Sequence, residues 1–434
     1  MRTASSGRAL VLHSYAKRRT RTEGARTPST SLDEAIGLAR GIGLKVVARA
    51  VVPLSRRRPA TLFATGKIDE LAAVVERTSS DVVIVDDTLT PIQQRNLERA
   101  WDTKVIDRTG IILEIFGARA RTGEGKLQVE LAALSYQRSR LVRSWTHLER
   151  QRGGFGFLGG PGESQLEADR RHIDARLHRI RRQLKAVEST RNLHRKERKK
   201  TPFPVVALVG YTNAGKSTLF NRFTDAGVVA QNALFATLDP TMRRITLPSG
   251  QAVILSDTVG FISDLPHELV AAFSATLEEV LHADVLIHVR DVAHPETDEQ
   301  KADVMRVLAE IGVGEGQPII EVQNKLDLLS AEDSTRIINS AERHVGTVPL
   351  SALDGSGCDD LLTMIDLQLF AENRIVDVEI AVDDGENLAW LYRHGEVIAR
   401  DDNDSFARVR ISLSDADRSR LERIAAGASS VRVC

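Results

Sequence analysis

The chain has 434 residues, enough for roughly two to four domains that each bury a core of their own. Its 59 basic and 59 acidic residues leave no net charge, and its two cysteines, Cys358 and Cys434, exclude a disulfide scaffold. Because the chain has no run of about 18 apolar residues and no hydrophobic signal core after Met1, we expect a soluble cytoplasmic protein without membrane insertion.

Residues 1–110 are predicted to form a small α/β domain, because short β-rich runs alternate with helical stretches. The predicted strands are 9–13, 45–52, 82–85 and 104–106, and the predicted helices are 31–41, 67–77 and 91–101. The loop before the first helix carries four arginines that either contact RNA or point into solvent. They are Arg18, Arg19, Arg21 and Arg26.

Residues 111–200 are predicted to form a basic helical hairpin. Positions 137–200 hold 18 Lys or Arg against 7 Asp or Glu, a surplus typical of surfaces that bind phosphate backbones. Apolar residues at helical spacing predict a seam that packs on a partner helix over 127–152. The seam residues are Leu166, Ile173, Leu177, Ile180, Leu184 and Val187. A capping box from Ser164 to Glu167 is expected to begin this helix.

The tip of the hairpin, residues 153–162, contains six glycines together with Phe155 and Phe157. Two interpretations of these phenylalanines stay open. Either they stack on RNA bases while neighbouring arginines neutralise phosphate, or they pack against an adjacent domain.

A phosphate-binding loop is predicted at the start of the third domain, residues 201–373. The apolar run 205–209 is typical of a buried parallel strand, and residues 217–220 are typical of the opening of a helix. Between them the G-x-x-x-x-G-K-S spacing is formed by Gly210, Tyr211, Thr212, Asn213, Ala214, Gly215, Lys216 and Ser217. We expect backbone N–H groups and the helix dipole to face the β-phosphate, Lys216 to reach the β- and γ-phosphates, and Ser217 to hold Mg²⁺.

Guanine specificity is predicted from the N-K-x-D pattern that follows the apolar run 319–322, roughly 110 residues after the phosphate-binding loop. The pattern consists of Asn324, Lys325, Leu326 and Asp327. The Asp327 carboxylate can accept hydrogen bonds from N1–H and the exocyclic amine of guanine, whereas adenine would leave it unpaired. Asn324 is expected to brace the loop and the Lys325 stem to cover the base. GTP and GDP are therefore the expected ligands.

Two short segments are predicted to close the site. The first follows the strand-like run 253–255 and consists of Asp257, Thr258, Val259 and Gly260. It places a carboxylate near the metal and the Gly260 N–H near the γ-phosphate, where it acts in catalysis. The second follows 348–350 and consists of Ser351, Ala352 and Leu353. The Ala352 N–H is expected to donate to guanine O6.

A third segment supplies a threonine for Mg²⁺ and the γ-phosphate. Its predicted binding residues are Phe235, Ala236, Thr237, Leu238 and Asp239. From the residues alone, Thr237 and Thr241 both fit this role.

Residues 374–434 are predicted to form a small α+β domain with no visible chemistry, for which we expect a docking or packing role. The predicted strands are 376–382, 407–413 and 431–433, and the predicted helices are 387–395 and 415–426.

The phrases G-Y-T-N-A-G-K-S-T-L-F-N, L-F-A-T-L-D-P-T, D-T-V-G-F-I and L-P-H-E-L-V-A-A-F resemble the HflX family, which belongs to the Obg-HflX superfamily of P-loop GTPases. Similarity extends to T-G-K at Thr65, to D-D-T-L-T-P-I-Q-Q-R-N-L from Asp86 and to the glycine-rich tip, but little is found after about residue 375. In the related GTPases the earlier threonine of F-A-T-L-D-P-T is the ligand. This favours Thr237 as the metal ligand and as a catalytic residue beside Lys216 and Gly260.

The resemblance implies a multi-domain α/β protein with a Ras-like GTPase domain built on a parallel sheet. It also implies binding to the 50S ribosomal subunit and its RNA, and the splitting or rescue of stalled ribosomes under stress. An alternative with the same motifs is a GTP-dependent RNA chaperone or ribosome-assembly factor. ATP-dependent RNA remodelling, suggested for the family, has no phosphate-loop pattern in residues 1–110 to support it. We expect a monomer.

Two positions indicate how hydrolysis is controlled. Phe261 stands where Ras-like enzymes carry a water-orienting glutamine, so intrinsic turnover is expected to be slow and completed by a partner. Asn213 occupies the position at which certain related GTPases hold K⁺ against the phosphates. Here it either binds K⁺ or braces the loop.

Overall fold

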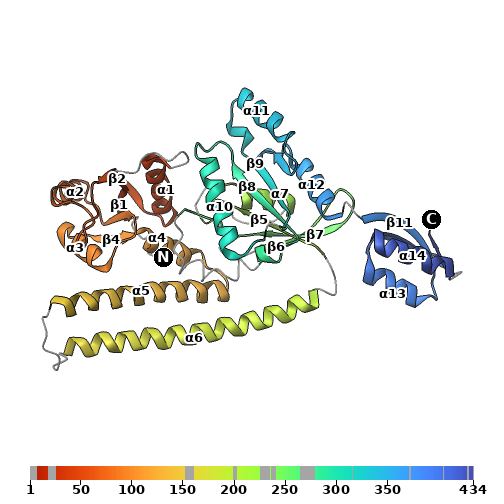
Figure 1. The fold of residues 1–434 in the computed structure, drawn as a ribbon, viewed down its shortest axis with the longest axis horizontal. Helices are drawn as coiled ribbons and strands as arrows, with labels where there is room; N and C mark the ends of the chain where they lie inside the picture. The colour runs from red at the N-terminus through yellow and green to blue at the C-terminus, as the bar shows by residue number, and fades with distance from the viewer. Residues whose placement is uncertain are drawn as a thin grey trace, which may run out of the picture.

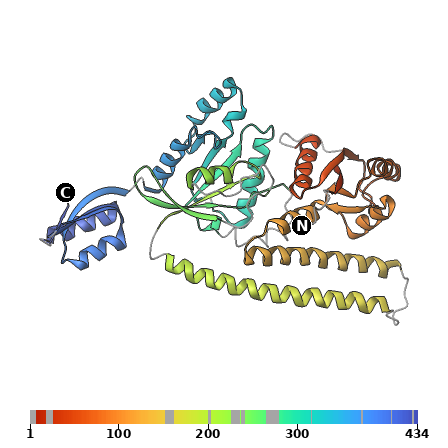
Figure 2. The same ribbon diagram turned by 180° about the vertical axis from the view of Figure 1, so that it is seen from behind.

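The structure is a computed structural model in which four folded units follow one another along the chain (Figure 1). It describes residues 7–17, 26–151, 161–198, 203–224, 235, 241–263, 279–314, 316–370, 373–403, 405–427 and 430–433. A long helical hairpin runs beside the N-terminal unit and the central sheet, and the C-terminal unit lies at the opposite end from the N-terminal one (Figures 1 and 2). Within the described residues no helix is long and apolar enough to cross a membrane.

The N-terminal unit is the predicted α/β domain. Its elements are β1 (Arg8–Ala16), α1 (Pro28–Gly41), β2 (Lys45–Leu54), α2 (Thr65–Thr78), β3 (Val82–Asp86), α3 (Pro91–Trp101), β4 (Lys104–Asp107) and α4 (Arg108–Arg119). The four strands form a parallel sheet in the order β2-β1-β3-β4, which confirms the predicted strands. Val83 and Val85 pack on the α2 and α3 side, whereas Val82 and Ile84 pack on the α1 and α4 side. The continuous apolar run of β3 is therefore buried on both faces.

The hairpin consists of α5 (Gly123–Gln151) and α6 (Pro161–Arg198), which lie side by side. The predicted seam is confirmed where side chains are described, since Leu177 and Ile180 are 2% and 0% exposed. The capping-box prediction was wrong, because α6 begins at Pro161 and not at Ser164. A proline fits the first turn of a helix, where its missing N–H has no partner to lose. Residues 152–160, which include Phe155 and Phe157, lie outside the described residues.

The third unit is the predicted GTPase domain. Its elements are β5 (Val205–Gly210), α7 (Lys216–Thr224), β6 (Thr241–Thr246), β7 (Ala252–Asp257), β8 (Val285–Asp291), α10 (Thr297–Ile311), β9 (Ile319–Asn324), a 3₁₀ turn (Leu326–Leu328), α11 (Ala331–Ala341), β10 (Thr347–Pro349) and α12 (Cys358–Phe370). The sheet order is β10-β9-β8-β5-β7-β6, and all neighbours are parallel except β6 and β7. The predicted parallel sheet is confirmed. Cys358 is buried with a free thiol, and Cys434 lies outside the described residues.

The C-terminal unit is an antiparallel sheet with two helices. Its elements are β11 (Asn373–Ala381), α13 (Gly385–His394), β12 (Glu396–Asp402), β13 (Phe406–Ser414), α14 (Asp415–Gly427) and β14 (Val431–Val433). The order β12-β13-β11-β14 and the β-α-β-β-α-β succession are those of a ferredoxin-like fold. The sequence pattern missed β12, an edge strand that ends in Arg400, Asp401 and Asp402 and lacks clean apolar alternation.

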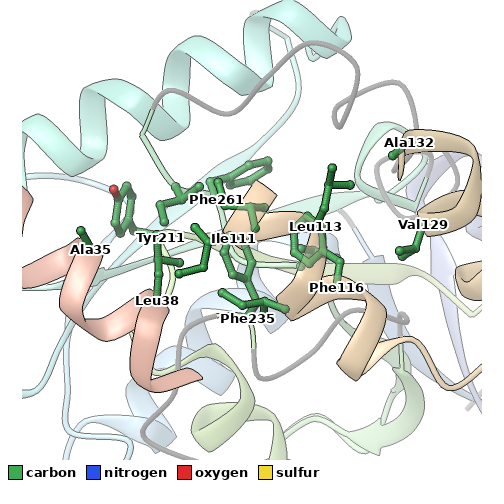
Figure 3. Packing of buried hydrophobic residues seen from close by; sticks show 14 of the residues in the cluster. Ala35, Leu38, Ile111, Leu113, Phe116, Val129, Ala132, Tyr211, Phe235 and Phe261 are labelled. Atoms are coloured by element: carbon green, nitrogen blue, oxygen red, sulfur yellow. The ribbon is translucent and has the colours of Figure 1, made fainter. Parts of the chain in front are cut away.

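One hydrophobic cluster joins the N-terminal domain to the GTPase domain (Figure 3). Ile111 and Phe116 of α4 pack there with Tyr211, Phe235 and Phe261. The rings of Phe116 and Phe235 meet edge to face, with centroids 4.7 Å apart. Such a pair contributes about 0.5–1.5 kcal/mol beyond its buried area. The two domains therefore share a core that includes residues of the predicted nucleotide site.

Candidate GTP-binding site

The phosphate-binding loop joins the carboxyl end of β5 to the start of α7. Gly210 has φ +148°, and a Cβ there would lie 2.2 Å from the Val289 carbonyl oxygen. Gly215 has φ +104°, and a Cβ there would lie 2.1 Å from Asn324 Nδ2. Both positions therefore require glycine, and the loop can pass close to the neighbouring strands. The exposed Asn213 also has positive φ, at 62°.

Lys216 is already held over this loop. Its Nζ donates to the carbonyl oxygens of Gly210, at 3.0 Å, and Tyr211, at 2.8 Å, and the residue is buried. Burial lowers the pKa of Lys216 to about 8, and the nearby Asp257 carboxylate opposes that shift only in part. The structure therefore fixes the ammonium in place without supplying it with a close anionic partner of its own.

The affinity for GTP is expected to fall about fourfold between pH 7.0 and pH 8.5. With a pKa of about 8 in the free protein, Lys216 loses its charge over this range, whereas bound phosphates favour the charged form. Binding therefore takes up a proton, and affinity falls as pH rises. Fluorescence titration with a non-hydrolysable GTP analogue at constant ionic strength measures the effect. In Lys216→Arg the side chain stays charged, so affinity should be lower overall but flat with pH. A flat wild-type profile would contradict the assignment.

Ser217, one of the two predicted metal ligands, lies at the start of α7 beside the carboxylate that was expected near the metal. Ser217 Oγ donates to Asp257 Oδ2 at 2.8 Å, and Asp257 is fully buried at the end of β7. A hydroxyl and a carboxylate are the oxygen ligands that Mg²⁺ prefers, with water and phosphate completing its shell. The donor set therefore fits Mg²⁺.

Gly260 lies directly against the phosphate-binding loop. A Cβ on Gly260 would lie 2.9 Å from Thr212 Cα and 3.0 Å from Lys216 Nζ, so a side chain would push the two segments apart. Thr258 Oγ1 donates to the Leu208 carbonyl oxygen and ties this segment to β5, and Val259 is buried beside it. The segment from Asp257 to Gly260 thus lies beside β5 and the phosphate-binding loop.

The predicted switch segment is described only at Phe235, which is 2% exposed and anchored on Phe116. Ala236, Thr237, Leu238 and Asp239 lie outside the described residues.

The predicted base-binding residues form a connected network at the carboxyl ends of β9 and β10. Asn324 Nδ2 donates to the Ala214 carbonyl oxygen at 2.8 Å, so Asn324 braces the phosphate-binding loop. Asn324 Oδ1 accepts from the Ala352 N–H at 2.9 Å, and guanine O6 would therefore share this donor. Ser351 Oγ donates to Asp327 Oδ1 at 2.6 Å, which fixes the orientation of the carboxylate.

Lys325 and Leu353 surround this network. Lys325 has φ 72°, and its Nζ pairs with Asp291 Oδ2 at 2.6 Å, which holds the stem along the turn. Leu326 opens the 3₁₀ turn behind it, and Leu353 is 70% exposed at the rim.

Sequence reasoning missed two residues that support the base-binding loops. Asp291 anchors Lys325 from the end of β8, and Arg222 donates to the carbonyl oxygens of Ala352 and Leu353 from α7. Neither residue stands in a recognisable motif. Only the apolar run before Asp291, which marks the end of another parallel strand, was available as a signal.

The chain matches four family models in succession. They are described as GTP-binding GTPase N-terminal over residues 29–117, GTP-binding GTPase Middle Region over 119–198, 50S ribosome-binding GTPase over 205–325 and HflX C-terminal domain over 336–431. It is 49% identical over 391 residues to GTPase HflX of Magnetococcus marinus, which covers 90% of each chain. It is 50% identical over 329 residues to GTPase HflX of Escherichia coli strain K12, which covers 75% of this chain and 76% of that one.

The chain belongs to the HflX family of GTPases. It therefore binds guanine nucleotide and hydrolyses GTP, as the predicted site implied. Because the C-terminal HflX model reaches residue 431, the expectation that the resemblance ends near residue 375 was wrong. Among solved structures, a GTP-binding protein from Sulfolobus solfataricus in complex with GDP is similar, with 23% identity and a TM-score of 0.45, covering 83% of this chain and 98% of that chain.

Proposed function

We propose that this HflX-family GTPase works in the cytoplasm as a monomer, binds the 50S ribosomal subunit through its basic hairpin, and separates stalled ribosomes under stress when it carries GTP. The observation that carries the proposal is a row of exposed, unpaired arginines on α6. The family model described as a 50S ribosome-binding GTPase, over residues 205–325, supports the same partner.

The lysine and arginine residues of α6 whose side chains the structure describes fall into two groups. Arg170, Arg171 and Arg176 pair with Asp174, Glu167 and Glu130, at 3.9, 2.8 and 2.6 Å. The second group has no carboxylate partner among the described residues, and all of its members are exposed: Arg179, Arg181, Arg182 and Lys185. In Figures 1 and 2, α6 is the outer helix of the hairpin and α5 lies between it and the domains. The unpaired charges are therefore accessible to a phosphate backbone.

The site supports hydrolysis by positioning and by electrostatic stabilisation. Lys216 is held by two carbonyl oxygens of the phosphate-binding loop, and from there it would reach the β- and γ-phosphates. Gly260 lies against the same loop, and its N–H would donate to the γ-phosphate. When bound, Mg²⁺ neutralises charge that develops on the phosphates, with Ser217 as a protein ligand and Asp257 hydrogen-bonded to it. Thr237 is proposed as the second metal ligand, and Asn213 as the residue that would hold K⁺.

Neutralising three unpaired arginines in the triple variant Arg179→Gln, Arg181→Gln and Arg182→Gln should weaken binding to the 50S subunit and leave GTP affinity unchanged. Each lost phosphate contact should flatten the log–log salt dependence of binding by roughly 0.7–0.9 unit. Subunit affinity measured across a salt series, for wild type and variant, decides the outcome.

The matched control removes three exposed arginines elsewhere, by Arg336→Gln, Arg343→Gln and Arg418→Gln. It changes the net charge equally and should keep the wild-type slope. Equal slopes for all three proteins would mean that the α6 charges face only solvent.

The proposal is tested by co-sedimentation of the protein with mature 50S subunits in the presence of a non-hydrolysable GTP analogue or GDP. We expect binding that is strong with the analogue and weak with GDP. Binding only to immature subunits would favour the ribosome-assembly alternative and contradict the proposal.

A further inference from the structure

A single carboxylate of the N-terminal domain holds two segments of the GTPase site together. Glu34 lies in α1, and its side chain is 11% exposed. Its Oε2 accepts a hydrogen bond from the Tyr211 hydroxyl, the second residue of the phosphate-binding loop. Its Oε1 accepts from Ser263 Oγ at 3.1 Å, three residues after Gly260. Glu34 therefore contacts both of the segments that are expected to flank the γ-phosphate.

The two GTPase segments are also joined directly. The Thr212 N–H donates to the Phe261 carbonyl oxygen at 2.7 Å, and the Phe261 N–H donates to the Gly210 carbonyl oxygen at 3.1 Å. The Ser263 N–H donates to the Tyr211 hydroxyl at 2.9 Å. The Tyr211 hydroxyl thus donates a hydrogen bond to Glu34 and accepts one from the Ser263 N–H. These bonds fix the position of the segment after Gly260 relative to the phosphate-binding loop.

Arg108 completes the same contact from the start of α4. Its Nη2 donates to Ser263 O and Ser263 Oγ, both at 3.0 Å, and to Glu34 Oε1. Its Nη1 donates to Asp86 Oδ1 at 2.6 Å, and His13 supports Asp86 at 2.7 Å. Asp86 ends β3 and His13 belongs to β1, at the point where the strand order of a doubly wound sheet changes direction. In doubly wound sheets, the crevice at this change of direction usually binds a ligand. Here Arg108 links Asp86, at that position, to Ser263 of the GTPase domain.

Arg26 adds a second cation to the cluster. It donates to the Tyr211 hydroxyl at 2.9 Å and to Asp303 of α10 at the same distance. Its side chain is 16% exposed, so neither the RNA-contact nor the solvent interpretation of this arginine is correct. Arg18, Arg19 and Arg21 lie outside the described residues.

Ion pairs between opposite charges stabilise the cluster around Glu34. Burial opposes ionisation of Glu34, but Arg108 and Arg26 outweigh it and hold its pKa below the usual range. The carboxylate is therefore ionised at neutral pH. Removing one charged side chain of the cluster would leave the remaining buried charges without an opposite charge beside them.

We infer that Glu34 and Arg108 are positioning residues for GTP hydrolysis, which act through Tyr211 and Ser263 to hold the segment after Gly260 in fixed register on the phosphate-binding loop. Gly260 is separated from Phe261 by one peptide bond, so the place of its N–H depends on that register. Among the predicted nucleotide residues that the structure describes, the hydrogen bonds of Glu34 and Arg108 reach only Tyr211. Their loss should therefore slow the chemical step and leave nucleotide affinity unchanged, because a misplacement of about 1 Å costs up to a hundredfold in rate.

The test uses the full chain and single-turnover GTP hydrolysis without ribosomes, together with GDP affinity and the unfolding temperature. The variants are Glu34→Gln, the nearly isosteric Tyr211→Phe, and the double variant. We expect each single variant to lower the hydrolysis rate about tenfold or more, and Glu34→Gln, which lies outside the nucleotide-binding residues, to keep its GDP affinity within about twofold of wild type. Because the hydrogen bond between Glu34 and Tyr211 is lost in both single variants, the double variant should be less slow than the product of the two single effects.

Asp33→Asn is the matched control, since Asp33 precedes Glu34 and its side chain makes only an exposed ion pair, with Arg49, within the part of the chain that the structure describes. It should hydrolyse GTP at the wild-type rate. Unchanged or faster hydrolysis in Tyr211→Phe would overturn the inference, as would a loss of GDP affinity equal to the loss of rate. Multiplicative effects in the double variant would also overturn it, because they would place Glu34 and Tyr211 on separate routes.

Discussion

Asp327→Asn should lower the affinity for GTP by roughly a hundredfold to ten-thousandfold and make xanthosine triphosphate the preferred nucleotide. The carboxylate is expected to accept two charge-assisted hydrogen bonds from guanine, each worth about 1.5–3 kcal/mol. The Ser351 hydroxyl donates to Asp327 Oδ1 at 2.6 Å, and it would hold the oxygen of the new amide in the same way. The amide nitrogen then faces the base, where guanine offers donors and xanthine offers a carbonyl oxygen.

The measurement is a pair of dissociation constants, for GTP and for xanthosine triphosphate, in wild type and variant. Asp360→Asn is the control, because it makes the same substitution on an exposed helix turn outside the site. An unchanged preference in Asp327→Asn would place the base elsewhere.

Large ribosomal subunits should raise the rate of GTP hydrolysis by a hundredfold or more. This effect approaches the increase in rate that a catalytic group from a partner protein produces in other GTPases. Phe261 occupies the position from which Ras-like enzymes orient water, and its side chain is apolar and 4% exposed. It packs in the cluster shared with the N-terminal domain, beside Tyr211 (Figure 3). The side chain at this position therefore does not orient water, and we expect a partner to supply the group that does.

Turnover is measured with saturating GTP, alone and with purified 50S or 30S subunits. We expect the 50S subunit to stimulate and the 30S subunit to have little effect. The triple variant of Arg179, Arg181 and Arg182 should need a higher 50S concentration to reach the same rate. Equal turnover with and without 50S subunits would show that the protein completes its own site.

The nucleotide site could be predicted from the sequence because each part is a short phrase at the carboxyl end of an apolar strand. In a parallel sheet those ends meet at one edge, so the sequence predicts that Lys216, Gly260 and Asn324 lie together. Local spacing also predicted the seam of α6, since helical periodicity is a property of the segment itself.

The contacts between domains could not be predicted in this way. Glu34 lies in an ordinary helical pattern, and nothing near it indicates that it meets Tyr211, 177 residues further along the chain. The charge of Arg26 in a polar loop predicts an RNA or solvent contact, and the sequence does not show that its partners include the partly buried Asp303 of a distant helix. β12 was missed because an edge strand needs only one neighbour and shows no clean alternation.

The most direct test of the account is the dissociation of intact 70S ribosomes, followed by sucrose-gradient sedimentation, after addition of the protein with a non-hydrolysable GTP analogue or with GDP. We predict conversion of 70S ribosomes into 50S and 30S subunits with the GTP analogue and little conversion with GDP, and reduced conversion by the α6 triple variant. Intact 70S ribosomes in the presence of protein bound to the GTP analogue would contradict the proposed function.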